Sequence, residues 1–160
     1  YAARGAAARA FRDDLARGGP PDPFTLAPRS GAEVARTFVS VVRGLHRPRS
    51  PLAQWEDAVL SHLEGPLFED AYLSTGGQLM GLAAGADAAV LDPRPLVGGA
   101  TGLCAHPYDL AAIVVARSAG VVVEALPPGP LDVPLDTSTD VAWAGYANSE
   151  IAELVRPHSP

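Results

Sequence analysis

Asp109 lies near the expected start of a helix, a position that favours negative charge. Pro107 suits the first position of a helix, because its missing N–H needs no partner there, and an apolar run follows it to residue 119. Asp109 is therefore expected in the first helical turn, where the helix dipole stabilises an anion. Acidic residues are common at such positions for this electrostatic reason alone. Asp109 is a candidate functional carboxylate, with simple helix stabilisation as the alternative.

A second group of candidate residues opens another expected helix. Ser74 and Thr75 can cap that helix or donate to a ligand, and capping is the usual role of these residue types. Gly76 and Gly77 carry no side chain that would keep a substrate away from the backbone N–H groups. His106 directly precedes the other helix and is either its N-cap or a group that faces a ligand. Ligands of α/β sheets gather at helix N-termini and strand C-termini, so we expect both helix starts at one edge.

The elements that must position these residues alternate along the chain. β-branched and apolar runs predict strands, and apolar spacing with Pro, Gly or Asn at the ends predicts helices. Strands that alternate with helices predict an α/β fold with a layered, mostly parallel sheet flanked by helices. The expected strands are 36–42, 67–73, 88–91, 121–125 and 141–146, and the expected helices are 51–63, 75–85, 107–119 and a last one capped by Asn148.

The first 30 residues differ in composition from the rest of the chain. Residues 1–17 are rich in Ala and Arg and predict a short surface helix, and the Pro- and Gly-rich residues 18–30 predict a linker. We therefore divide the chain into an N-terminal helix and linker, 1–30, and one α/β domain, 31–160.

Composition excludes several classes of function. The net charge of −6 and the pI near 5.1 argue against nucleic acid as a partner. The chain has no Lys, which excludes a P-loop of the usual form and a Schiff-base enzyme. Its single cysteine allows no internal disulfide, which fits a cytoplasmic location. No apolar run is long enough to span a membrane.

Three segments resemble one known family in their order and spacing. Residues 108–112 read Tyr-Asp-Leu-Ala-Ala and are followed by Ala-Gly and a Val-rich strand. They resemble the C-terminal signature of the inositol monophosphatase family, Trp-Asp-x-Ala-(Ala/Gly) and then Glu-Ala-Gly-Gly. Residues 74–88 resemble the Gly-(Ser/Thr)-Ala-Ala helix of that family and the strand after it, and residues 140–148 resemble its last strand. The resemblance covers residues 36–155.

The resemblance implies a Mg²⁺-dependent phosphomonoesterase that acts on a small phosphorylated polyol or sugar. It implies that Asp109 is a Mg²⁺ ligand, since hard Mg²⁺ prefers carboxylate and phosphate oxygens. It further implies that Gly76 and Gly77 line the substrate site, as the small residues at the matching positions of the family do.

The departures from the family pattern matter as much as the matches. The first metal motif of the family, Asp-Pro-(Ile/Leu)-Asp-Gly-(Thr/Ser), and the Glu-Glu pair upstream of it do not occur in this chain. The resemblance therefore implies only the C-terminal half of such an enzyme, inactive by itself and dependent on a missing N-terminal half, a companion chain or self-association as a homo-oligomer. The alternative is a non-catalytic module of the same fold that binds a small anion or a protein.

Overall fold

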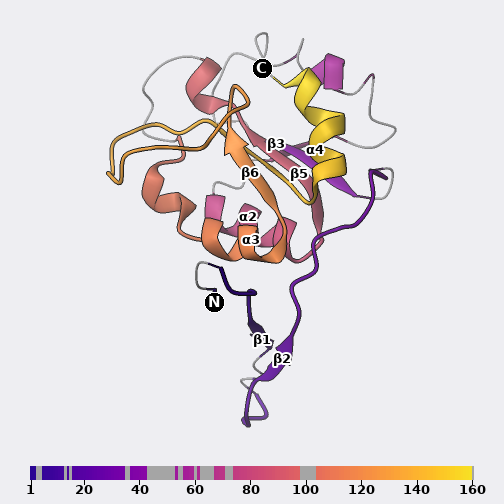
Figure 1. Ribbon diagram of the computed structural model, residues 1–160, viewed down its shortest axis with the longest axis vertical. Helices are drawn as coiled ribbons and strands as arrows, with labels where there is room; N and C mark the ends of the chain where they lie inside the picture. The colour runs from indigo at the N-terminus through magenta and orange to yellow at the C-terminus, as the bar shows by residue number, and fades with distance from the viewer. Residues whose placement is uncertain are drawn as a thin grey trace.

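A five-stranded sheet forms the centre of the molecule (Figure 1). The computed structural model describes residues 1–2, 5–12, 14, 16–34, 37–42, 53, 56–59, 61, 67–70, 74–97 and 104–159. The strands are β3 (Phe38–Val42), β4 (Leu67–Asp70), β5 (Asp87–Asp92), β6 (Val122–Ala125) and β7 (Trp143–Tyr146). Their order across the sheet is β4-β3-β5-β7-β6.

Most strands of the sheet run in one direction. β3 is parallel to β4 and to β5, while β7 is antiparallel to both β5 and β6. β6 therefore points the same way as β3, β4 and β5, and only β7 is reversed. The expected α/β fold with a mostly parallel sheet is confirmed.

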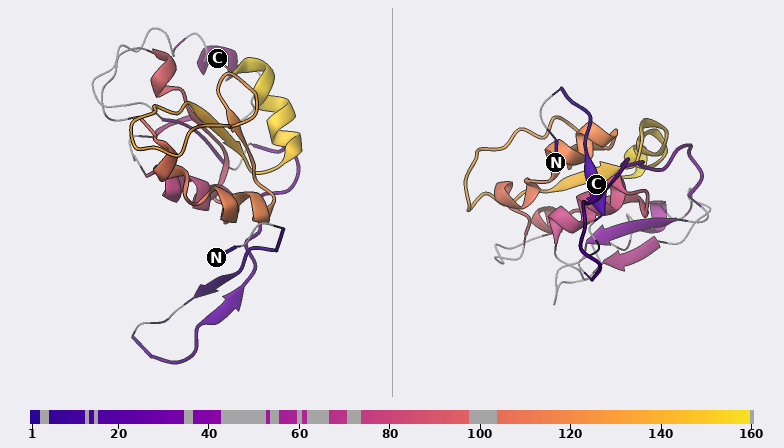
Figure 2. Two further views of the ribbon diagram at one scale, coloured as in Figure 1. Left: turned by 60° about the vertical axis from the view of Figure 1, so that its left-hand side comes forward. Right: turned by 90° about the horizontal axis from the view of Figure 1, so that it is seen from below.

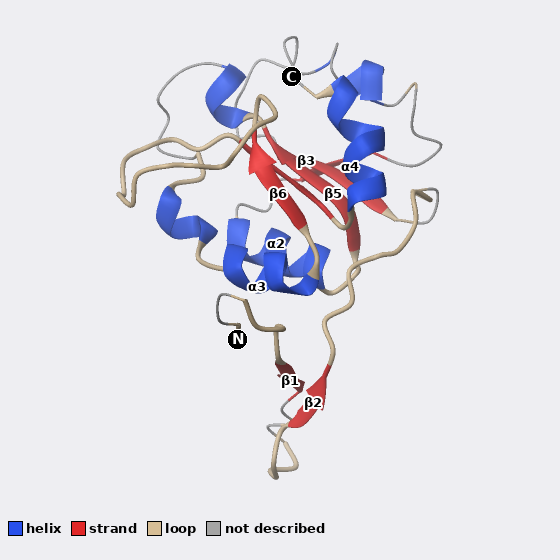
Figure 3. Cartoon of the chain, viewed as in Figure 1, coloured by secondary structure: helices blue, strands red, loops and turns tan. Residues whose placement is uncertain are grey.

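Helices cover both faces of this sheet (Figure 3). The α-helices are α2 (Thr75–Ala83), α3 (Ile113–Ala119) and α4 (Ser149–Val155), and the 3-10 helices are η1 (Arg94–Val97), η2 (Pro107–Leu110) and η3 (Arg156–His158). No described helix is long and apolar enough to cross a membrane.

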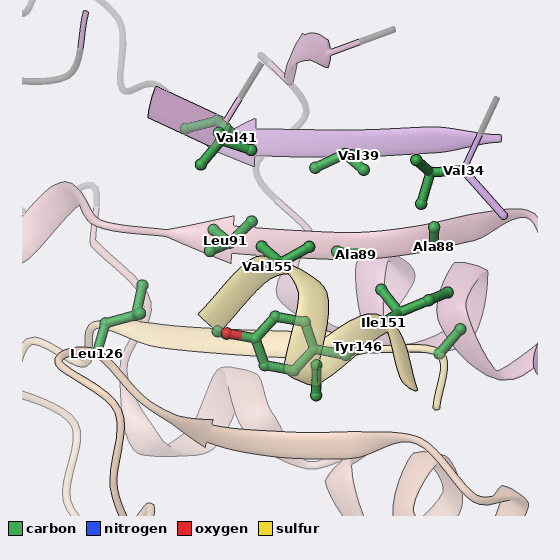
Figure 4. Packing of buried hydrophobic residues seen from close by; sticks show 14 residues of the cluster. Val34, Val39, Val41, Ala88, Ala89, Leu91, Leu126, Tyr146, Ile151 and Val155 are labelled. Atoms are coloured by element: carbon green, nitrogen blue, oxygen red, sulfur yellow. The ribbon is translucent and has the colours of Figure 1, made fainter. Parts of the chain in front are cut away.

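The core has two apolar layers, one on each face. Side chains alternate along β5, so Ala89 and Leu91 pack toward α4, while Val90 packs toward α2 and α3. Figure 4 shows the layer under α4, where Ile151 and Val155 of that helix lie against the sheet. The period of two in the strands thus produces a sheet that is buried on both sides.

Asn148 is the N-cap of α4, as expected. The Asn148 side-chain oxygen accepts a hydrogen bond from the Ile151 backbone N–H at 2.9 Å. The same side chain donates from its nitrogen to the backbone oxygens of Arg29, at 2.7 Å, and Gly31, at 3.1 Å. One side chain therefore begins α4 and holds the N-terminal segment against the body of the fold.

The surface helix expected over 1–17 is wrong. Residues 10–12 instead form β1 (Ala10–Arg12), which pairs antiparallel with β2 (Asp22–Phe24) inside the expected linker. This hairpin projects away from α2 and α3 (Figures 1 and 2). The segment offers few large apolar residues, so little packing supports a short helix that is marginal alone. Leu26, after the hairpin, is buried against α2.

Other expected boundaries need smaller corrections. The helix expected over 107–119 is divided into η2 and α3 by a turn at residues 111–112, and α3 ends at Gly120 in the left-handed conformation, with φ of 106°. Of the helix expected over 51–63, residues 53 and 56–59 are helical and the others lie outside the described residues, except Ser61 in a turn. Residues 71–73 of the second expected strand also lie outside them.

Candidate functional site

Polar residues gather where β5 ends and β7 begins. The segment before η2 reaches the segment before β7 through an isolated antiparallel bridge, in which the Val141 N–H donates to the Ala105 oxygen at 2.8 Å. This bridge places His106 beside Asp140, with the imidazole Nε2 3.5 Å from a carboxylate oxygen. Two residues that are far apart in the sequence thus share one edge of the sheet.

The predicted position of Asp109 in a first helical turn is confirmed, in a 3-10 helix. Its carboxylate accepts a hydrogen bond from the His106 backbone N–H at 2.9 Å, and its own N–H donates to the His106 oxygen at 2.9 Å. The same carboxylate oxygen lies 3.6 Å from the imidazole Nδ1. His106 is therefore the N-cap residue of η2, and Asp109 already stabilises the start of that helix.

The His106 ring is held from three sides. Asp109 and Asp140 lie beside its two nitrogens, and the Tyr108 ring stacks on it with centroids 5.5 Å apart and an angle of 7° between the planes. The imidazole is 13% exposed, whereas the two carboxylates are about one-third exposed, at 32% and 33%. We call His106, Asp109 and Asp140 the carboxylate–histidine group. The two carboxylates of this group are therefore partly open to solvent, whereas the imidazole is mostly covered.

A further carboxylate lies in the loop between β6 and β7. Asp136 accepts hydrogen bonds from the Thr139 hydroxyl at 2.7 Å, from the Thr139 N–H at 2.8 Å and from the Ser138 N–H at 2.9 Å. The hydroxyl of Thr139 is the largest cause of a lowered pKa of Asp136, and the two backbone donors and the nearby His106 lower it further. This loop therefore holds an ionised carboxylate near His106.

A buried ion pair lies at the end of β5. Arg94 donates from Nε to one Asp92 oxygen at 2.7 Å and from Nη2 to the other at 2.6 Å, and both side chains are almost fully buried. Desolvation raises the pKa of Asp92, against the opposing effect of the guanidinium. The Trp143 indole also lowers the pKa of Asp92, although its Nε1 makes no hydrogen bond of good geometry. Asp92 and Arg94 are therefore buried in the fold rather than exposed in a surface turn.

The start of α2 has the expected capping residue. The Ser74 hydroxyl accepts from the Gly77 N–H at 3.2 Å, and Thr75 is buried. A Cβ added to Gly76 would meet no atom of the described residues within 4 Å, and Gly77 is exposed. Ser74 therefore performs the ordinary capping role.

The start of α2 lies toward the edge of the sheet that carries Asp109. α2 ends at Ala83, close before β5 begins at Asp87, and the two elements pack together, so the helix start lies toward the far end of β5. α2 also packs against η2, and Leu110 of η2 shares an apolar cluster with α2. Binding of one substrate by Gly76, Gly77 and His106 stays a prediction.

The described residues do not form a Mg²⁺ site by themselves. No three of their His, Cys, Asp or Glu side chains converge in a way that could hold a metal ion. Mg²⁺ requires near-octahedral oxygen ligands and gives up its water reluctantly. Asp109 offers one carboxylate, and one of its oxygens already accepts from His106. The assignment of Asp109 as a metal ligand stays a prediction.

Sequence reasoning missed Asp136 and Asp140 as members of this edge. Both lie in or after a Pro-rich loop whose path the sequence does not determine. One signal was available, because Asp140 directly precedes a predicted strand, and strand ends are where α/β sheets collect polar groups.

Comparisons with known proteins identify the fold. No protein-family model matches the sequence, and no curated protein matches it. In structure, the chain is similar to Mycobacterium tuberculosis SuhB, with a TM-score of 0.64 and 17% identity over 98% of this chain and 51% of that one. It is also similar to inositol monophosphatase from Anabaena (Nostoc) sp., with a TM-score of 0.59 and 18% identity over 92% and 54% of the two chains.

A third solved structure agrees with these two. A hypothetical protein from Pyrococcus horikoshii, described as having similarities to inositol-1 monophosphatase, matches with a TM-score of 0.56 and 19% identity over 89% of this chain and 50% of that one. The chain therefore has a partial inositol monophosphatase-like fold and spans about half the length of the solved proteins it matches.

Proposed function

We propose that this chain is the C-terminal half of a Mg²⁺-dependent phosphomonoesterase that hydrolyses a small polyol or sugar phosphate in the cytoplasm. The observation that carries the proposal is the half-length likeness, because 98% of this chain aligns with only 51% of the M. tuberculosis protein. The first-turn position of Asp109 supports it, since this is the carboxylate that the Tyr-Asp-x-Ala-Ala signature would supply. The 160-residue chain alone is then inactive.

The contribution of this chain to such a reaction is to bind and orient the phosphate ester. No group of carboxylates that would hold a metal and direct the attacking water is present among the described residues, and the missing half would supply it. No atom of the described residues blocks the approach to Gly76 within 4 Å of an added Cβ, and a ligand would meet N–H groups that attract oxygen atoms at the start of α2. His106 and Asp109 would lie on the other side of that ligand.

The test begins with the coding DNA upstream of the Tyr1 codon. We expect an Asp-Pro-x-Asp-Gly-(Thr/Ser) stretch there and release of phosphate from inositol monophosphate by the longer product in the presence of Mg²⁺. Asp109→Asn should reduce turnover on the order of 100-fold, the scale for removing one electrostatic contact to a reacting group. Asp132→Asn, a change to an exposed loop carboxylate, is the matched control and should leave turnover unchanged.

Two results would contradict this proposal. Turnover by the 160-residue chain that is sensitive to Asp109→Asn would show that no second half is needed. A coding sequence without the upstream motif, together with no activity, would favour the alternative of a non-catalytic module.

Mg²⁺ titration of the chain alone should show millimolar or weaker binding in calorimetry, because a single carboxylate replaces few of the waters of the ion.

We further propose that the chain without its other half self-associates. Phe11 and Phe24 on the hairpin are 44% and 43% exposed, and exposed apolar surface recruits partners. Sedimentation over a concentration series should show a rising mean mass, which Phe24→Ser reduces. Leu135→Ser is the matched control, because Leu135 is 95% exposed in another loop. A monodisperse monomer at every concentration would contradict the proposal.

A further inference from the structure

The β1–β2 hairpin lacks the packing that normally stabilises a pair of strands. Each strand has three residues, and all but Ala10 are exposed. The hairpin extends from the body of the fold, which leaves its outer edges uncovered by the described helices (Figure 2). An isolated two-stranded hairpin is marginally stable in water, and a third strand or a covering helix is needed for independent stability. The hairpin is therefore incomplete as a sheet.

The first residue of the chain already pairs with the hairpin. The Tyr1 amino group donates to the Arg9 oxygen at 2.7 Å, and the Arg9 N–H donates to the Tyr1 oxygen at 2.8 Å. Such a two-way exchange defines a hydrogen-bonded pair of antiparallel strands. Arg9 directly precedes β1, so Tyr1 lies beside the start of that strand.

The pairing with Tyr1 is on the edge of β1 that faces away from β2. Phe11 is opposite Pro23, which has no N–H, so these two residues cannot exchange both hydrogen bonds. Bonding groups alternate along an antiparallel strand, so Ala10 and Arg12 bond to β2, whereas Arg9 and Phe11 present theirs to the outer edge. Arg9 pairs there with Tyr1, and the N–H and C=O of Phe11 come next along the same edge.

Side-chain packing supports the same register. The Tyr1 and Phe11 rings stack with centroids 6.0 Å apart and 16° between their planes. When Tyr1 is opposite Arg9, Phe11 is its diagonal neighbour on the same face, and diagonal neighbours are within reach of aromatic side chains. Tyr1 therefore has both the backbone and the side-chain contacts of a residue in a third strand.

We propose that the polypeptide leading into Tyr1 forms a third antiparallel strand along the outer edge of β1. The inference rests on the proposed function, in which that polypeptide belongs to the N-terminal half of the enzyme. In the register set by Tyr1 and Arg9, the second residue before Tyr1 pairs with Phe11 and the third lies opposite Arg12. Main-chain hydrogen bonds to an exposed strand edge thus join the two halves.

A disulfide trap in the longer protein tests this register. Arg12 and the third residue before Tyr1 form a pair without mutual hydrogen bonds, in which Cα atoms lie about 4.5 Å apart, within disulfide range. Cysteines at these two positions should cross-link on mild oxidation. The matched control places the second cysteine one residue nearer Tyr1, where it points to the opposite face and should not cross-link. Cys104 is buried and remains in both variants.

Hydrogen exchange of the Phe11 amide gives a second readout. This amide should exchange at least about tenfold more slowly in the longer protein than in the 160-residue chain, a factor equal to about 1.4 kcal/mol. The Ala10 amide, which bonds to β2, should change less. Both proteins are compared at a concentration at which the short chain is monomeric. Equal exchange of Phe11 in the two proteins would then overturn the proposal.

The two proposals fail in different ways. If the longer protein cross-links and protects Phe11 but has no phosphatase activity, the third strand stands and the proposed phosphatase function falls. If the longer protein is active but its cysteines do not cross-link in the stated register, the function stands and the third strand falls. A coding sequence with fewer than three residues before Tyr1 would overturn the third strand directly.

Discussion

Two groups of carboxylates and basic side chains lie near the same edge of the sheet, and they differ in burial. In the first, Asp92 and Arg94 have side chains that are 0% and 4% exposed and bind each other through two short hydrogen bonds. In the second, the carboxylate–histidine group, the carboxylates keep about a third of their surface in solvent. The Asp92–Arg94 pair therefore stabilises the interior of the fold, whereas the carboxylate–histidine group is partly accessible from solvent.

The two groups are also assembled differently. Asp92 and Arg94 are two residues apart, and the Arg94 backbone N–H also donates to the Asp92 carboxylate at 3.3 Å. The carboxylate–histidine group depends on the Ala105–Val141 bridge, which joins distant parts of the chain. The buried pair is therefore formed by local contacts, whereas the solvent-facing group requires a contact between distant parts of the chain.

The largest expected effect is the loss of stability when the buried pair is broken. Arg94→Met leaves the Asp92 carboxylate buried without its partner, and we expect the free energy of unfolding to fall by about 3 to 5 kcal/mol. Urea denaturation measures it. The control is Arg17→Ala, which removes an ion pair to Asp14 at 3.5 Å whose side chains are 88% and 56% exposed. That surface pair contributes at most about 1 kcal/mol.

Equal losses in the two variants would remove the distinction between a buried and an exposed pair. The same result would mean that water reaches Asp92 and restores its hydration. In that case the end of β5 would belong to the ligand-accessible part of the edge.

A smaller effect is expected from the carboxylate–histidine group. Asp109→Ala removes the acceptor for the His106 N–H at the start of η2, and loss of such a capping contact costs about 1 kcal/mol. Asp109→Asn keeps a side-chain oxygen and should lose less. Thermal unfolding of both variants, with Asp132→Ala as the matched exposed control, measures the difference. A loss as large as that of Arg94→Met would place Asp109 among the structural residues.

Local signals in the sequence predicted most of the elements. The short apolar run 88–91 indicated β5, and Asn148 and Gly120 marked the start of α4 and the end of α3. These signals work because capping and side-chain period act within a few residues. The first-turn position of Asp109 followed from Pro107 in the same way.

Contacts between distant residues were not predictable from local patterns. The burial of Arg94 depends on what covers the end of β5, and the approach of Asp140 to His106 depends on a long loop between β6 and β7. The hairpin at residues 10–24 was missed because Ala- and Arg-rich sequence favours helix when no partner strand is considered. Such features are decided by tertiary packing rather than by propensity.

The smallest expected effect concerns the titration of Asp136, next to the carboxylate–histidine group. Hydrogen bonds from Thr139 and Ser138 lower its pKa below the ordinary value of 3.8, so this group contributes stability that is complete above that value and is lost as the pH falls through its folded-state pKa. Thr139→Val removes the hydroxyl donor, which is the largest cause of the lowered pKa, and should raise the pKa of Asp136 toward 3.8. NMR titration of the Asp136 carboxyl carbon measures the shift. Ser138→Ala is the matched control, because Ser138 donates through its backbone N–H, which the substitution keeps. An unchanged midpoint in Thr139→Val would mean that the backbone donors alone hold the charge, and that the loop beside His106 is set by its main chain rather than by this hydroxyl.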